Sequence, residues 1–446
     1  MTLKVNRAES SFDDFKPALT GPQAFTEASR CLFCSDAPCI QACPTEIDIP
    51  GFIRRITTDN LRGSAKAIFD ANILGMSCAR VCPVETLCVG DCVYNEMGVP
   101  PIQIGKLQRF VTDTAFDEGW RFHKAGPDSG KSIGLVGGGP ASLAAAHMLR
   151  RLGHHCTIYD RASQLGGLNR TGVAPYKMKA DRALEEVEWI LSIGGIDLEL
   201  GVEIGSAVPF AELEARHDAL FLGFGLGPDS RLGAEGEALA GVRGAVDFIE
   251  EMKLNELPLD GVERAIIVGG GNTAIDAVRE CLGLGIPSVT MVYRRDEASM
   301  SGYAHEWREA KQEGARALWR HQPLSFEGAE GQVQGLRCVA LDDERRPVEG
   351  SEQSVPADLV LLAIGQGRLE ELVADLDGIE RDRGRIVTDD DGATGRAGYF
   401  AAGDCRNGGK EVVNAAGEGK RAARAIDAYL KAGGSLRAQR VGGDNG

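Results

Sequence analysis

The stretch SIGLVGGGPASLAAAHMLRRLGHHCTIYD, residues 132–160, decides the fold of the central part of this chain. A short apolar run ends in a glycine turn, a helix-forming segment follows, and a second apolar run ends at Asp160. Gly137 and Gly139 occupy the first two glycine positions of a dinucleotide-binding turn, and Ser142 stands where a third glycine or alanine is usual. The glycines let backbone N–H groups approach a pyrophosphate, and a carboxylate after the second strand can accept ribose hydroxyls. This order predicts a nucleotide-binding domain with a mostly parallel sheet covered by helices.

The residues around this turn indicate which nucleotide it binds. The helix that begins near Pro140 and Ala141 directs the positive end of its dipole towards the pyrophosphate. Gly166, Gly167 and Leu168 follow the second strand at the spacing where flavoenzymes accommodate the rest of FAD. The alternative is a glycine turn that binds no ligand, and the strand and helix on either side argue against it. We therefore predict an FAD site.

A second unit of the same kind spans residues 264–295, with RAIIVGGGN, then TAIDAVRECLGLG, then SVTMVYRR. Gly269 and Gly271 recur in its turn, but the second strand ends in Arg294 and Arg295 and not in a carboxylate. A guanidinium at this point favours a ribose phosphate, which an acid would repel, so the pair favours NADPH. The alternative is that the two arginines form a solvated basic patch, because exposed arginine pairs are common.

A dense block of cysteines precedes both units. Eight of the 12 cysteines lie in CLFCSDAPCIQACP and CARVCPVETLCVGDC, namely Cys31, Cys34, Cys39, Cys43, Cys78, Cys82, Cys88 and Cys92. Thiolates two to four residues apart can turn inward around one cubane, and a Cys before Pro, as at Cys43 and Cys82, commonly serves a second cluster. We predict two iron-sulfur clusters. One alternative is structural zinc, which favours paired two-residue spacings. The other is disulfide bonds, which form mainly in exported proteins, and the sequence shows no export signal. Cys78 lies in a helical stretch four residues before Cys82, so eight thiols do not by themselves define eight ligands.

Length and charge exclude several classes of protein. A chain of 446 residues with 43% hydrophobic content is long enough for two to four domains. The formal net charge of -16 and the pI near 5.0 disfavour nucleic acid or an anionic membrane as a partner. The sequence shows neither a signal peptide nor a stretch long enough to cross a bilayer, so we expect a cytoplasmic protein.

These features predict a multidomain α/β protein. We expect a mainly α-helical iron-sulfur domain over residues 1–128, an FAD-binding domain over 129–245 and 366–446, and an NAD(P)H-binding domain over 246–365. The segment GYFAAGDCRNGGKEVVNAAGEGKRAARAIDAYL contains a strand, a turn and a helix, and it returns to the FAD domain, so that the second Rossmann-like domain is inserted in the first. Asp404 in its turn is suited to accept from a ribityl hydroxyl of the flavin. The chain is expected to be disordered after Gly433.

Five motifs occur in a specific order: CLFCSDAPCIQACP, LGMSCARVCPVETLCVGDC, PPIQIGKLQRF, GGGPASL and GGGNTAID. In this order they resemble the N-terminal half of dihydropyrimidine dehydrogenase, above all the separate bacterial subunit that pairs with a pyrimidine-binding subunit. The resemblance runs from about Cys31 to the final helix.

The resemblance implies a set of binding residues. One [4Fe-4S] cluster would be held by Cys31, Cys34, Cys39 and Cys92, and the second by Cys43, Cys82, Cys88 and Gln108, which leaves Cys78 as a non-ligand. FAD would lie on Gly137, Gly139, Pro140, Ala141, Ser142, Asp160, Gly166, Gly167, Leu168, Asp404 and Lys177, where the family has Arg. NAD(H) or NADP(H) would lie on Gly270, Gly271, Asn272, Thr273, Arg294, Arg295 and Gly365. A further basic contact of the family for the ribose phosphate falls near Ser301, which favours NAD.

The resemblance also implies a reaction. Hydride from NAD(P)H would reduce FAD, and electrons would then pass through the two clusters to an FMN-containing partner subunit of a hetero-oligomer. The partner subunit would reduce uracil or thymine to the 5,6-dihydropyrimidine or catalyse the reverse reaction. No side chain of this chain is expected to act as a catalytic acid or base.

Two other functions are compatible with parts of this pattern. The small subunit of glutamate synthase shares the domains, but its second cysteine group is more compact than the interval from Cys82 to Cys88, and Glu is typical at the position of Gln108. A non-enzymatic redox-sensing nucleotide-binding protein is the alternative from another class. The presence of both glycine turns and all eight expected cluster ligands argues against it.

Overall fold

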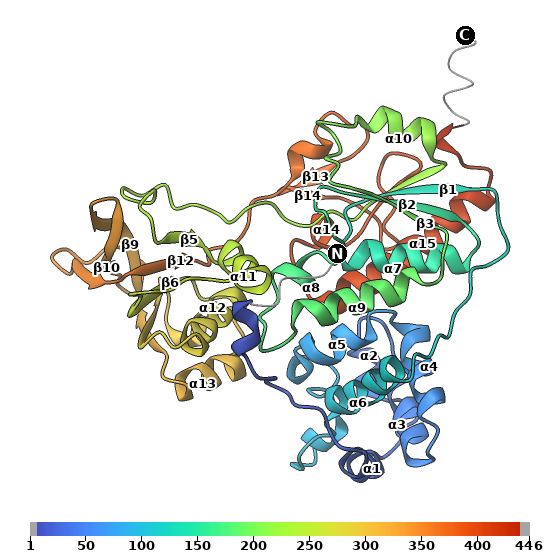
Figure 1. Ribbon diagram of the computed structural model, residues 1–446, viewed down its shortest axis with the longest axis horizontal. Helices are drawn as coiled ribbons and strands as arrows, with labels where there is room; N and C mark the ends of the chain where they lie inside the picture. Colours follow the sequence, from blue (N-terminus) through green and yellow to red (C-terminus); the bar gives the residue numbers. More distant parts are fainter. Residues whose placement is uncertain (1–6, 438–446) are drawn as a thin grey trace. The chain divides into compact units, whose positions relative to one another are not determined.

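The computed structural model describes residues 7–437, which form two compact units (Figure 1). Unit 1 contains the described residues up to Asp14, residues 171–180 and residues 227–367. Unit 2 contains residues 15–170, 181–226 and the described residues from 368 onwards. Each unit is therefore assembled from segments that are far apart in the sequence.

The first part of unit 2 is helical, as predicted. Its helices are α1 (Gly21–Ser29), α2 (Pro38–Gln41), α3 (Ile49–Thr57), α4 (Leu61–Ala71), α5 (Gly75–Val81) and α6 (Ile104–Asp117), with the short 3-10 helices η2 (Val84–Thr86) and η3 (Val93–Asn95). The carboxylate of Asp48 caps α3 by accepting from the N–H of Gly51 at 3.0 Å. Ile49, Phe52 and Ile53 then fall on one face at helical spacing and are buried.

Five parallel strands form the main sheet of unit 2, in the order β15-β4-β1-β2-β3. Their bounds are β1 (Ser132–Val136), β2 (His155–Asp160), β3 (Ile196–Leu200), β4 (Ala219–Leu222) and β15 (Tyr399–Ala401). The last strand of the chain thus pairs with β4 in the sheet of the first glycine turn, which confirms the predicted insertion. Helix α7 (Pro140–Arg151) packs against β2, and α15 (Val412–Lys431) packs along α7 (Figure 1).

Shorter elements complete unit 2. They are α8 (Leu168–Thr171), α9 (Ala180–Leu191), α10 (Phe210–Arg216), η5 (Glu370–Val373), the pair β13 (Arg381–Asp382) and β14 (Arg385–Ile386), and α14 (Asp404–Asn407). The last residue of α8 and the first residue of α9 belong to unit 1.

One hydrophobic core joins the helical part and the sheet part of unit 2. It includes Phe52, Ile68 and Leu107 from the helices and Leu135 and Ala145 from β1 and α7. The predicted domains 1–128 and 129–245 therefore share a core, and the three-domain division remains a prediction.

Unit 1 contains a second parallel sheet, in the order β5-β12-β6-β7-β8. Its strands are β5 (Val242–Gly244), β6 (Arg264–Val268), β7 (Ser288–Tyr293), β8 (Arg316–Trp319) and β12 (Leu359–Leu362), and its helices are α11 (Ala245–Leu254), α12 (Asn272–Gly283) and α13 (Ala304–Gln312), with η1 (Ala8–Ser11) and η4 (Glu297–Ser299). Because β5 pairs with β12, this sheet begins before the predicted boundary at residue 246.

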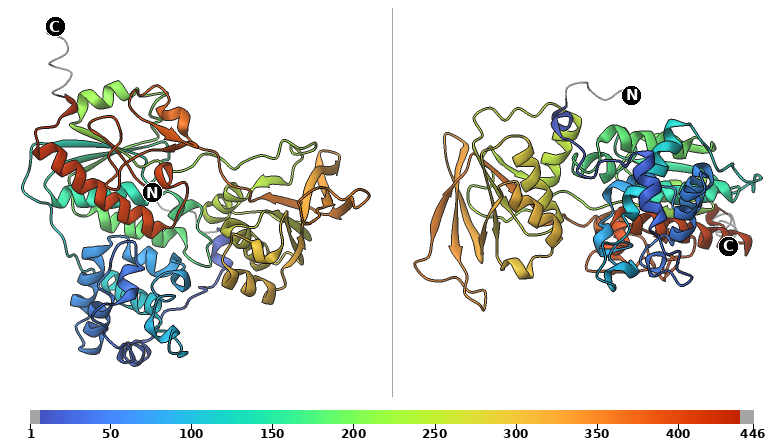
Figure 2. Two further views of the ribbon diagram at one scale, coloured as in Figure 1. Left: turned by 180° about the vertical axis from the view of Figure 1, so that it is seen from behind. Right: turned by 90° about the horizontal axis from the view of Figure 1, so that it is seen from below.

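An antiparallel sheet follows β8 and was not predicted. Its strands are β9 (His321–Ala329), β10 (Gln332–Ala340) and β11 (Gln353–Pro356), in the order β11-β10-β9. Figure 2 shows it in orange at the edge of unit 1.

The end of α15 differs from the prediction. The hydroxyl of Ser435 donates to the carboxylate of Asp218 at 2.7 Å, and Leu436 is buried. The prediction of disorder after Gly433 is therefore wrong for these two residues, while residues 438–446 lie outside the described part. Within residues 7–437, no helix is both long and apolar enough to span a membrane.

Candidate cofactor sites

The first glycine turn leaves no room for a side chain at Gly137 or at Gly138. Gly137 has φ +98°, and a Cβ on it would lie 2.7 Å from the Cα of Phe224. The N–H of Gly138 donates to Asp160 at 2.6 Å, so this carboxylate fixes the turn itself, a role that the sequence did not reveal. A Cβ on Gly167 would lie 2.9 Å from the Cα of Gly139. The turn at 137–139 and the turn at 166–168 are thus in backbone contact.

The helix after this turn presents unsatisfied polar groups. Gly139 is the N-cap of α7 and offers no side chain, so the N–H groups of the first turn lack a side-chain acceptor. The hydroxyl of Ser142, in the same turn, is buried without a hydrogen-bond partner among the described residues. Free donors at a helix N-terminus suit a phosphate. The local structure therefore fits the predicted dinucleotide.

Asp404 lies close to the same turn, although more than 250 residues separate them in the sequence. A Cβ on Gly403 would lie 3.0 Å from the Cβ of Ala141, and the N–H of Gly403 donates to Glu418 at 2.9 Å. Burial and the neighbouring Glu418 raise the pKa of Asp404 to about 6. Unit 2 therefore brings together the three segments at 137–142, 166–168 and 403–404, as the FAD prediction requires.

Lys177 lies elsewhere. It belongs to unit 1, where its ammonium forms ion pairs of 2.9 Å with Asp276 and with Glu306. The other residues proposed for FAD belong to unit 2, and the role of Lys177 as a flavin contact remains a prediction.

The second glycine turn has a similar local geometry. A Cβ on Gly269 would lie 2.2 Å from the carbonyl oxygen of Ala363, and one on Gly270 would lie 2.6 Å from the ring of Tyr293. Asn272 begins α12 and its side chain accepts from the N–H of Tyr303 at 3.0 Å, while Thr273 follows in the first turn of this helix.

The charged residues near this turn concern the choice of nucleotide. Arg294 and Arg295 directly follow β7, and within residues 7–437 no carboxylate forms an ion pair with either of them. Arg320, in contrast, is paired with Asp296 at 3.4 Å. The hydroxyl of Ser301 donates to the carbonyl of Gly270 at 3.2 Å. Two available guanidinium groups thus lie at the end of β7, the position at which NADP-binding Rossmann folds carry an arginine for the ribose phosphate.

Gly365 follows β12 with φ +107°, and a Cβ on it would meet no atom within 4 Å. The backbone at this position is therefore open on the side where a ligand can approach.

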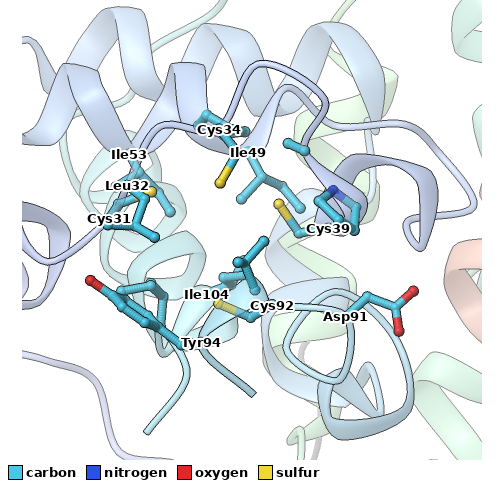
Figure 3. Close-up of a pocket in the computed structure, with 15 residues that line it drawn as sticks. Cys31, Leu32, Cys34, Cys39, Ile49, Ile53, Asp91, Cys92, Tyr94 and Ile104 are labelled. Carbon is cyan, nitrogen blue, oxygen red and sulfur yellow. The ribbon is translucent and has the colours of Figure 1, made fainter. Parts of the chain in front are cut away.

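The first cysteine group lines one pocket (Figure 3). Cys31 and Cys34 come from the loop after α1, Cys39 from α2 and Cys92 from the segment before η3. Apolar side chains such as Ile49 complete the wall. In Figure 3, Cys34 and Cys39 point into the space and Cys92 approaches from the opposite side. Burial, followed by repulsion from Cys31, Cys92 and Cys34, raises the pKa of Cys39 to about 12. Thiolates crowded in this way need a cationic centre, which a cluster supplies.

The second cysteine group contains one thiol more than the resemblance implies. Burial raises the pKa of Cys88 to about 12, with Cys43 as the next cause. The pKa of Cys82 is raised first by its hydrogen bond with Cys78 and then by burial. Cys78 therefore lies beside Cys82, one of the three expected thiols. Gln108, the expected fourth ligand, is 7% exposed on α6, and its amide donates to the carbonyl of Gly75 at 2.8 Å.

The zinc alternative requires thiols that converge on one ion. In the described part of the chain, no three His, Cys, Asp or Glu side chains converge on a site for one metal ion. A tetrahedral zinc ion would bring its sulfurs within about 3.8 Å of one another. The positions of these side chains therefore show no zinc site in the described part of the chain.

One buried acid near the cysteines was missed by the sequence analysis. Glu186 on α9 is 1% exposed, and its carboxylate accepts from the N–H groups of Met76 at 2.9 Å and of Ser77 at 3.1 Å and from the Ser77 hydroxyl. These groups lie at the N-terminus of α5, the helix of Cys78. Burial raises the pKa of Glu186 to about 7, because the hydrogen bonds only partly offset desolvation. A lone Glu in an amphipathic helix gives no sequence signal of this contact.

Known protein families match both parts of the chain. Residues 7–120 match the family described as dihydropyrimidine dehydrogenase domain II, 4Fe-4S cluster. Residues 131–419 match the pyridine nucleotide-disulphide oxidoreductases. The two matches together agree with the order of the cysteine block and the glycine turns.

Individual proteins are similar over nearly the whole chain. The glutamate synthase [NADPH] small chain of Halomonas elongata is 34% identical, over 94% of this chain and 92% of that protein. The NAD-dependent dihydropyrimidine dehydrogenase subunit PreT of Escherichia coli is 33% identical, over 95% of this chain and 98% of that protein. Among solved structures, FprA of Mycobacterium tuberculosis in complex with NADPH is similar, with a TM-score of 0.55 and 19% identity. The similar part covers 70% of this chain and 89% of that chain, and the likeness concerns the fold.

The helical part with its cysteines, the two glycine turns and these similarities lead to one conclusion. The chain belongs to the pyridine nucleotide-disulphide oxidoreductase family and carries, in front of that part, a 4Fe-4S domain of the dihydropyrimidine dehydrogenase type.

Proposed function

We propose that this chain is an electron-input subunit that oxidises NAD(P)H and passes the electrons through FAD and two [4Fe-4S] clusters to an FMN-containing, pyrimidine-binding partner subunit. The observation that carries the proposal is the composition of unit 2. Both cysteine groups and the first glycine turn belong to one unit, in which a shared hydrophobic core joins the cysteine-bearing helices to β1 and α7. A flavin and iron-sulfur clusters bound there would share a single rigid support.

The residues of the chain would bind and orient these groups. The free N–H groups at the start of α7 would hold the pyrophosphate of FAD, and Asp404 would bind the ribityl chain. The four thiols of the first group would hold one cluster, and Cys43, Cys82, Cys88 and Gln108 the other. When bound, the flavin converts a two-electron hydride transfer into single electrons, each of which a cluster can accept.

The pyridine nucleotide would bind in unit 1, on the turn at Gly270 to Thr273. The available Arg294 and Arg295 support NADPH. Ser301, where the family has a further basic contact, supports NADH. The PreT proteins are named as NAD-dependent and the glutamate synthase chain as NADPH-dependent, so the relatives support each choice equally.

The small subunit of glutamate synthase is the second candidate function. The similarity to such chains, at 34% identity over almost the entire length, supports it. The six-residue interval from Cys82 to Cys88 and the glutamine at position 108 favour the pyrimidine enzyme. The partner subunit and its substrate are what distinguish the two candidates.

Purification under anaerobic conditions tests the proposal. Iron, acid-labile sulfide and flavin should be present at about eight iron and eight sulfide per FAD, as two cubanes require. The chain alone should reduce ferricyanide with NAD(P)H but should not reduce uracil. Co-expression with a pyrimidine-binding subunit should add uracil reduction, and co-expression with a glutamate synthase large subunit should not add glutamate formation. A protein without flavin, or with zinc on its cysteines, would refute the proposal.

A further inference from the structure

Helix α15 contacts both the second cysteine group and the first glycine turn. A Cβ on Gly417 would lie 2.6 Å from the carbonyl oxygen of Pro44, the residue after Cys43. A Cβ on Gly419 would lie 2.2 Å from the carbonyl oxygen of Ala141, in the first turn of α7. Neither glycine can carry a side chain without displacing backbone, so the backbone of α15 touches both segments.

Lys420 extends this contact with a charge. Its ammonium donates to the carbonyl oxygen of Ala71 at 2.6 Å and lies 3.5 Å from the carbonyl oxygen of Thr45. Ala71 is the last residue of α4, so the ammonium lies at the negative end of that helix. Within residues 7–437, no carboxylate forms an ion pair with Lys420. Backbone carbonyls therefore hold this cation in place.

The surroundings of Lys420 place its charge next to a thiol proposed as a ligand. Burial lowers the pKa of Lys420, and the nearby Arg424 and Arg151 lower it further, while Glu46 and Cys43 raise it. The ammonium lies 3.5 Å from the carbonyl oxygen of Thr45, and the hydroxyl of the same Thr45 lies 3.3 Å from the Sγ of Cys43, so one residue contacts both the cation and the thiol. In a partly buried setting such an interaction is much stronger than in water.

We infer that Lys420 is a positioning residue that holds the loop of Cys43 against α15 and stabilises the reduced form of the cluster on the second cysteine group. The inference rests on the proposed function. Reduction adds one electron to that cluster, and the electron is supplied by the reduced flavin, which received two electrons from NAD(P)H and releases its protons to solvent. A fixed positive charge beside Cys43 lowers the energy of the added negative charge and thus raises the reduction potential.

Four forms of the full chain test this inference, each loaded with FAD and clusters: wild type, Lys420→Gln, Lys420→Arg and Lys431→Gln. Glutamine removes the charge but can still donate to Ala71, whereas arginine keeps the charge at every accessible pH. Lys431 lies on the same helix, is exposed, and pairs with Asp427 at 2.8 Å, so Lys431→Gln is the matched control.

Redox titration followed by electron paramagnetic resonance is the measurement. In Lys420→Gln, the ratio of reduced to oxidised cluster at a given potential should fall about tenfold for one of the two clusters, which corresponds to about 59 mV for a one-electron couple. The reduction potential of the other cluster should not change in Lys420→Gln. In Lys420→Arg and Lys431→Gln, both potentials should equal those of wild type. An unchanged potential in Lys420→Gln, or loss of the cluster from both Lys420 variants, would overturn the inference.

Flavin content and ferricyanide reduction separate this result from the proposed function. If wild type lacks flavin or clusters, the proposed function itself fails. If wild type contains both and Lys420→Gln titrates like it, only the role of Lys420 fails.

Discussion

Replacing Glu186 with glutamine should change how the stability of the protein depends on pH. The carboxylate of Glu186 is enclosed between α9 and the N-terminus of α5, and burial raises its pKa to about 7. Its acceptor role towards the N–H groups of Met76 and Ser77 can be taken over by the glutamine oxygen. The variant therefore removes the titration and preserves most of the contact.

The size of the effect follows from linkage. Glu186 has a pKa of about 7 in the folded protein against an ordinary value of 4.5, and this difference corresponds to roughly 3 kcal/mol. Because the folded pKa is the higher one, the folded state binds the proton more tightly than the unfolded state. The stability that the neutral acid contributes is fully present below pH about 4.5, falls as the pH rises, and is lost once the pH has passed about 7. Relative to wild type, Glu186→Gln should be similar at pH 5 and more stable by up to about 3 kcal/mol at pH 8.5.

Thermal unfolding at a series of pH values measures this difference. For a unit of this size the expected gain at pH 8.5 is roughly 6 °C in Tm. Infrared spectroscopy gives an independent readout, because the C=O band of a protonated carboxyl should disappear near pH 7 in wild type and be absent from the variant.

Glu188→Gln is the control, since Glu188 lies on the same helix and is exposed. Glu188→Gln should change Tm by the same small amount at pH 5 and at pH 8.5. A Glu186→Gln variant whose Tm difference from wild type is the same at pH 5 and pH 8.5 would refute the reasoning.

Three further predictions concern the cofactors. Gly419→Ala should weaken FAD binding roughly 5- to 150-fold, because its Cβ would meet the carbonyl oxygen of Ala141 at 2.2 Å and overpacking costs about 1–3 kcal/mol. Equilibrium dialysis with FAD measures the dissociation constant, and unchanged binding would contradict the contact. Joint replacement of Arg294 and Arg295 by alanine should raise the KM for NADPH about tenfold or more, since hydrogen bonds to charged groups contribute about 1.5–3 kcal/mol. The KM for NADH should rise less than about twofold. Equal changes of the two KM values in ferricyanide assays would disprove a phosphate contact. Cys78→Ser should retain the iron and sulfide content of wild type, and loss of about four iron atoms would make Cys78 a ligand.

Much of the fold was predictable from local sequence. The strands β1, β2, β6 and β7 are short apolar runs bounded by glycine turns and charged residues, and they form where the pattern places them. The helices α3 and α6 follow apolar residues at a spacing of three and four. In each case the signal lies within about a dozen consecutive residues.

The candidate site was predictable only in part. The short spacing in CLFCSDAPC indicated a cluster, but Cys92 joins that pocket through the tertiary fold. The separation of the thiols into two groups was implied by resemblance and not by spacing. Lys177 carried no signal of its ion pairs with Asp276 and Glu306, because those partners are about 100 residues or more away in the sequence.

The sequence by itself determined the two glycine turns, the cysteine block and the return of the last strand, because backbone conformation, hydrophobic periodicity and metal-ligand spacing are properties of short segments. Only the tertiary structure decided that Glu186 would be buried against α5 and that Lys420 would contact Thr45 in the loop of Cys43. The physical reason is that burial and the approach of charges arise from segments distant in the chain, and they change the pKa of a side chain without leaving a pattern around it.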